Sequence, residues 1–70
     1  MNKKYTVYFE KENNCLLCKE RLETTFKNID VRTSENPLVL HINATDVNFE
    51  STRPLIKEFG GSVSGWEKSQ

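Results

Sequence analysis

Residues 4–28 read KYTVYFEKENNCLLCKERLETTFKN, and this stretch combines the pattern of a strand with the pattern of a helix. From residue 17 to about residue 28, apolar side chains return at helical spacing among charged ones, which predicts an amphipathic helix. Residues 4–10 are rich in aromatic and β-branched side chains, which predicts a strand. Alternation puts three of its side chains on one face: Tyr5, Val7 and Phe9.

The only cysteines of the chain, Cys15 and Cys18, lie between these elements as a CxxC pair. We expect residues 11–14 to form a polar loop in which Asn14 caps the helix. Cys15 would then lie in the loop or at the first helical position, and it should be the more exposed thiol. A helix N-terminus lowers the pKa of a thiol that faces it, and thiolates bind soft metals or exchange disulfides.

The second half of the chain carries a hairpin, a helix and a final strand. Residues 29–33 and 38–43 alternate apolar with polar side chains, and the turn sequence SENP between them predicts a hairpin. Residues 49–59 show helical spacing, which predicts a helix with Pro54 in its first turn and two glycines at its end. Residues 62–66 supply a short last strand.

The predicted order is β-α-β-β-α-β, followed by a frayed tail at residues 67–70. It indicates an α+β fold, a ferredoxin-like split sandwich with an antiparallel four-stranded sheet and two helices on one face. Right-handed crossovers place the first and third strands in the centre and the loop with Cys15 at one end of the sheet. The helix-covered face should take Leu38, Leu40 and Ile42.

Composition indicates one ordinary globular domain over residues 1–70. The chain is 36% hydrophobic, and its 10 basic and 10 acidic residues give no net field that would favour nucleic acid or an anionic membrane. No apolar run is long enough for a signal peptide or a membrane span. We therefore expect a cytoplasmic protein. A CxxC pair in that reducing compartment is metal-binding or catalytic more often than structural.

The CxxC pair, followed by Leu22 and Phe26 at helical spacing and then by a hairpin and a short helix, resembles the heavy-metal-associated domain family. Members of that family are soluble copper or mercury chaperones and modules of metal-pumping ATPases. The resemblance implies that Cys15 and Cys18 are metal ligands and that the chain is a metal carrier, not an enzyme. It also implies transfer of the ion to a metal-transporting ATPase or another metal-acceptor protein.

The metal depends on how many ligands are available. Cu(I) and Hg(II) accept two sulfurs, whereas Zn(II), like Cd(II), normally takes four ligands. His41 should lie on the open sheet face, far from the cysteines, and Glu12 or Glu20 could complete a zinc site. We rank Cu(I) and Zn(II) first, and expect a monomer or a dimer bridged by metal.

Other uses of the cysteines remain open. The strand, loop and CxxC helix also resemble the opening of glutaredoxins and related thioredoxin-fold proteins, which implies a dithiol oxidoreductase with Cys15 as nucleophile and Cys18 as resolving thiol. That fold needs a further helix before the segment at Pro37. A third hypothesis is an interaction module in which the cysteines have no chemical part.

Overall fold

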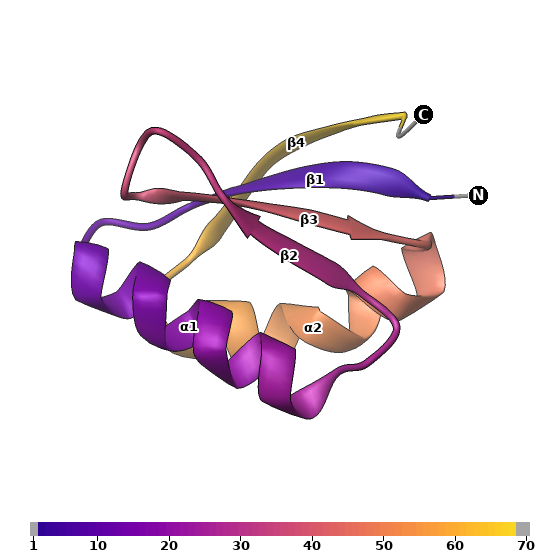
Figure 1. Cartoon of the computed structure of the whole chain (residues 1–70), viewed down its shortest axis with the longest axis horizontal. Coiled ribbons are helices and arrows are strands. Elements are labelled where there is room, and N and C mark those ends of the chain that lie inside the picture. Colours follow the sequence, from indigo (N-terminus) through magenta and orange to yellow (C-terminus); the bar gives the residue numbers. More distant parts are fainter. Residues whose placement is uncertain (1, 69–70) are drawn as a thin grey trace.

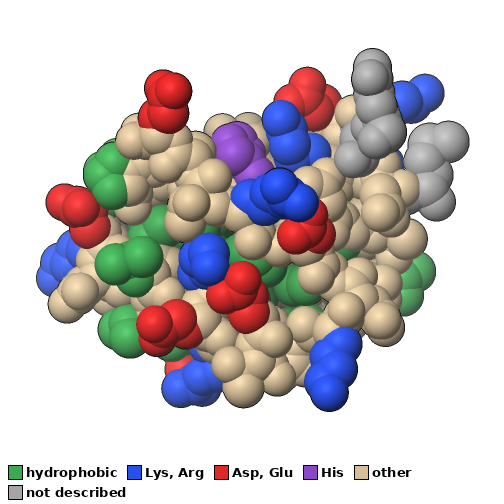
Figure 2. Space-filling model, in the orientation of Figure 1, with side chains coloured by type: hydrophobic (Ala, Val, Ile, Leu, Met, Phe, Trp, Pro, Cys, Tyr) green, Lys and Arg blue, Asp and Glu red, His purple; other side chains and the backbone are tan. Residues whose placement is uncertain are grey.

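The computed structural model describes residues 2–68 and has the predicted order of elements (Figure 1). The strands and helices are, in chain order, β1 (Lys3–Tyr8), α1 (Glu12–Thr25), β2 (Asp30–Thr33), β3 (Val39–Ala44), α2 (Asp46–Glu58) and β4 (Ser62–Lys68). Neither helix of this described part has the length and apolar character of a membrane span. Charged side chains of both signs are mixed on the face shown in Figure 2.

The four strands form one antiparallel sheet in the order β2-β3-β1-β4. The first and third strands therefore occupy the centre, as predicted, and β2 and β4 are the edges. Both helices lie against the same face of the sheet (Figure 1). The predicted α+β, ferredoxin-like split β-α-β-β-α-β sandwich is confirmed.

The core lies between the sheet and the helices. Alternation in β1 and β3 is confirmed, because Leu40 and Ile42 are fully buried while His41 between them is half-buried on the other face. Leu38 precedes β3 and is only half-buried, because the strand begins at Val39. The main apolar contributors from the other elements are Tyr5, Val7 and Phe9 from the β1 segment, Leu22 from α1, and Phe49 and Ile56 from α2.

Helix α1 begins at Glu12 and ends at Thr25, so the predicted span 17–28 is wrong at both ends. Its N-cap residue is Lys11, whose side chain makes no capping hydrogen bond. Asn14 lies inside the helix, and its predicted role as the cap is also wrong. The acidic Glu12 in the first turn suits the positive end of the helix dipole, which helps the helix to start before the cysteines.

Helix α2 also begins earlier than predicted, at Asp46. Thr45 is the N-cap, and its side-chain oxygen accepts a hydrogen bond from the Asn48 N–H at 3.3 Å. Pro54 consequently lies in the helix interior and not in the first turn, so that prediction is wrong. The strong Thr45–Asp46 start signal decides where this helix begins.

Two glycines connect α2 to β4, as predicted. Gly60 has φ of 78°, a conformation that favours glycine. At Gly61, a Cβ would lie 2.7 Å from Ile56 Cγ2 and 2.7 Å from Phe9 Cε2, so only glycine fits there without movement. Strand β4 continues to Lys68, so the predicted tail is strand over its first half, while residues 69–70 lie outside the described part.

Candidate functional site

Cys15 and Cys18 lie on adjacent turns of α1, and both point into the core. At this spacing Cβ atoms are about 5–6 Å apart. Cys15 is 2% exposed and Cys18 0%, and neither is in a disulfide. The expected position of Cys15 in the loop or at the first helical position is wrong, because α1 begins at Glu12 and the Cys15 N–H donates to the Lys11 carbonyl at 3.1 Å. Cys15 is the more exposed thiol, as predicted, but only by 2% against 0%.

Burial controls the acidity of both thiols. Desolvation raises the pKa of Cys15 above its ordinary value of 9.0. Desolvation, together with the charge of Cys15, raises the pKa of Cys18 to about 12. The net shift of the pKa is therefore upward in both thiols, opposite to the effect of a helix N-terminus. Both groups are thiols at neutral pH, and an arriving metal ion must displace their protons.

A cavity of about 200 Å³ lies beside Cys15. Its walls come from the start of α1 and from the turn between β2 and β3: Glu12, Cys15, Leu16, Thr33, Ser34, Asn36, Pro37 and Val39. Hydrogen bonds hold that turn, since the Leu38 N–H donates to Asn36 Oδ1 at 2.9 Å. Cys15 thus has a small access route, whereas Cys18 is enclosed.

Sequence reasoning missed the contribution of the hairpin turn to this cavity. The signal that could have found it is topological. Because β1 and β2 are parallel with α1 between them, the start of α1 and the end of β2 must lie at the same end of the sheet.

No third metal ligand accompanies the two sulfurs in the described part of the chain. Within residues 2–68 there is no group of three or more His, Cys, Asp or Glu side chains that could hold a metal ion. His41 lies on the open face, as predicted, with its Nδ1 atom 3.3 Å from Thr6 Oγ1. Glu12 and Glu20 are exposed. Glu12 also lines the cavity beside Cys15.

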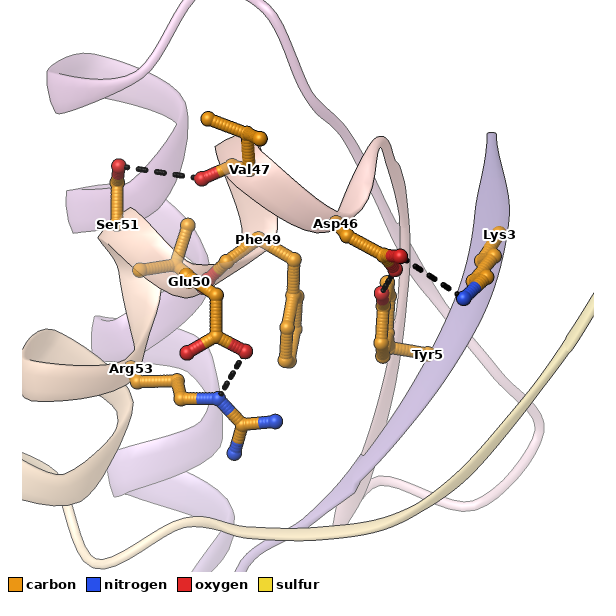
Figure 3. A network of polar contacts seen from close by, with 9 residues as sticks. Lys3, Tyr5, Asp46, Val47, Phe49, Glu50, Ser51 and Arg53 are labelled. Atoms are coloured by element: carbon orange, nitrogen blue, oxygen red, sulfur yellow. Dashed lines mark hydrogen bonds and ion pairs between the residues drawn. The ribbon is translucent and has the colours of Figure 1, made fainter. Parts of the chain in front are cut away.

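A second cluster, at the start of α2, combines an aromatic stack with polar contacts to Asp46 (Figure 3). Tyr5 and Phe49 stack with ring centroids 3.7 Å apart. The Tyr5 hydroxyl donates to Asp46, and Lys3 Nζ lies 2.9 Å from the same carboxylate. Burial and this carboxylate raise the pKa of Tyr5 to about 12, while the hydrogen bonds from Tyr5 and Lys3 lower the pKa of Asp46. Sequence reasoning placed Tyr5 on the same strand face as Val7 and Phe9 but did not find this contact.

Comparisons of the chain with protein-family models, with curated proteins and with solved structures give no match. The case for any function accordingly rests on the cysteines and their surroundings.

Proposed function

We propose that this chain binds a soft metal ion through Cys15 and Cys18 and transfers it to an acceptor protein. The observation that carries the proposal is the convergence of two thiols on one helix face beside a cavity that reaches Cys15. Two sulfurs one turn apart can hold the same ion after small rotations of their side chains.

Cu(I) and Hg(II) suit this donor set best, because either ion accepts two sulfurs. Zn(II) and Cd(II) favour four ligands, so they would require a dimer in which two molecules contribute their cysteines. We therefore rank Cu(I) as the cargo of the monomer. The family that the chain resembles implies a metal-transporting ATPase or another metal-acceptor protein as its partner, and we propose that the transfer takes place in the cytoplasm.

Transfer proceeds by exchange of sulfur ligands. Binding releases the two thiol protons to water, and the first turn of α1 opens to admit the ion from the side of Cys15. A partner thiolate then adds to the two-coordinate ion to give a three-coordinate bridge, and one original sulfur leaves. Cys15, which borders the cavity, engages the partner first. Cys18, anchored in the core, holds the ion longer.

One observation favours this proposal over a dithiol oxidoreductase. Strand β2 passes to β3 through a turn, with no helix between them, whereas the thioredoxin arrangement needs one. The raised pKa values of the two cysteines do not distinguish the two functions, because metal binding and disulfide exchange both need thiolates. The remaining alternative is that the cysteines only fill the core, with no chemistry.

The test is a Cu(I) titration against a competing chelator under reducing conditions. We compare the wild type with the double variant Cys15→Ala and Cys18→Ala, because serine would bury a hydroxyl without a partner. The wild type should compete with the chelator for Cu(I). Its apparent affinity for Cu(I) should rise about 100-fold per pH unit, because two thiol protons leave on binding. The double variant should not compete. Val31→Ala, a truncation elsewhere in the core, is the control and should bind as wild type.

Cu(I) binding by the double variant as tight as that of the wild type would refute the metal proposal. Loss of binding in Val31→Ala as well would attribute the effect to the fold and not to the sulfurs.

A further inference from the structure

Strand β4 is an edge strand with an open side. It runs over 7 residues, and within residues 2–68 no strand pairs with its outer edge. Nearly all its residues are exposed, including the single tryptophan, Trp66, at 55%. The unpaired N–H and C=O groups of such an edge are a template for an added strand.

The side chains of β4 on the helix side of the sheet are partly apolar. The register pairs Trp66 with Tyr5 and Val63 with Val7, so both belong to the face that carries the helices. A strand added to this edge would bring its own side chains on that face next to Val63 and Trp66.

A hollow of about 320 Å³ lies where α2 approaches the start of β4. Its lining combines two cations with an apolar floor and contains no carboxylate: Arg53, Ile56, Lys57, Gly61 and Val63. Charge and shape at this point therefore favour an acidic side chain flanked by apolar ones.

The nearby carboxylates do not neutralise the whole hollow. Glu50 binds Arg53 at 2.8 Å, and Asp46 binds Lys3 at 2.9 Å (Figure 3). Lys57 makes no ion pair within the described residues. Neither Glu50 nor Asp46 lines the hollow, so Lys57 presents a positive charge to an incoming segment.

We propose that an extended, acidic segment of another protein binds here by adding a strand to the outer edge of β4. One of its carboxylates pairs with Lys57 and Arg53, and a neighbouring apolar side chain packs against Val63 and Trp66. A second copy of this chain fits less well. Pairing β4 with its symmetry mate would place two cationic hollows on the same face of the joined sheet, and like charges there repel.

The probe is a displayed library of random peptides about ten residues long, which is enough for one strand with flanking residues. Selection on the wild-type chain should enrich peptides in which acidic residues alternate with aliphatic ones. Binding of an enriched peptide should change the Trp66 fluorescence and slow amide hydrogen exchange in β4. The double variant Arg53→Glu and Lys57→Glu should bind that peptide about 10-fold more weakly than the wild type does.

The matched control is the double variant Lys11→Glu and Lys27→Glu, which makes the same charge change at the two ends of α1 and should bind as wild type. Equal weakening in both double variants would overturn the proposal in favour of nonspecific attraction. The proposal would also be overturned if the selection enriched no acidic peptide. The same holds if sedimentation showed that the chain self-associates and that this association is what slows amide exchange in β4. None of these results depends on the cysteines, so the metal proposal is tested separately.

Discussion

The starts of the two helices differ in how they are held. At the start of α2, Thr45 caps the helix and the side chain of Asp46 binds Lys3 and Tyr5. At the start of α1, the N-cap Lys11 offers no side-chain hydrogen bond. A missing cap costs about 1 kcal/mol of helix stability. The turn that covers Cys15 is therefore the easier one to open.

This difference suits the proposed function. A metal carrier must hold its ligands in a defined frame and still let a partner thiolate reach them. Packing of Tyr5 on Phe49 fixes α2 to the sheet, whereas the cysteine end of α1 relies on apolar contacts and borders a cavity. Local opening with a low free energy is common where ligands enter.

The largest expected effect on stability follows from removing the Phe49 ring, which fixes α2 to the sheet. Phe49 is fully buried and stacks on Tyr5, so Phe49→Ala should destabilise the fold by about 3–5 kcal/mol. That is most of the stability of a domain this small. Cys18→Ala, in the other region, removes a smaller side chain and should cost about 0.5–3 kcal/mol. Urea unfolding followed by circular dichroism measures both.

The control is Leu16→Ala, whose side chain is more than half exposed and which should change stability by less than about 0.5 kcal/mol. If Cys18→Ala cost as much as Phe49→Ala, the cysteine end would be as firmly held as the α2 end, and the contrast would disappear.

A smaller effect is expected from exchanging the caps. Thr45→Ala removes the α2 cap and should cost about 1 kcal/mol. Lys11→Ser supplies a cap to α1, so it should add about 0.5–1 kcal/mol and slow the reaction of the thiols with an aromatic disulfide reagent. Rates followed by absorbance test this, with Lys27→Ser as the control.

Thiols in Lys11→Ser that react at the wild-type rate would show that the first turn of α1 does not govern access to them. The same slowing in Lys27→Ser would attribute the change to the loss of a positive charge.

The two regions also show what could be predicted from the sequence. The strand order follows from the handedness of the crossovers. The buried face of β3 follows from local alternation, which is visible in Leu40, His41 and Ile42. The start of α1 could not be predicted, because Lys11 carries no capping group and Asn14 imitates one. The burial of Cys15, its raised pKa and its cavity all follow from that start and from the hairpin turn, which only the folded chain brings together.

The smallest effect concerns the pH dependence of the hydrogen bonds that Asp46 accepts at the start of α2. The hydrogen bonds from Tyr5 and Lys3 lower the pKa of Asp46 in the folded state, so the unfolded state binds the proton more tightly. The stabilisation by these hydrogen bonds is complete when the pH is above 3.8, the ordinary pKa of an aspartate. It is lost as the pH falls from there through the lower pKa of Asp46 in the folded state. Asp46→Asn should therefore flatten the acid limb of a stability–pH curve.

Asp30→Asn is the matched control, because among residues 2–68 the Asp30 carboxylate binds only Arg32, in an exposed pair, and accepts no tyrosine hydroxyl. Urea unfolding from about pH 2 to pH 7 gives the slope for each variant. A wild-type slope in Asp46→Asn would mean that this carboxylate does not distinguish the folded from the unfolded chain. The start of α2 would then be stabilised by the Tyr5–Phe49 stack and the Thr45 cap, without a contribution from the Asp46 charge. The difference in stability between the starts of α2 and α1 would come from packing and capping and not from charge.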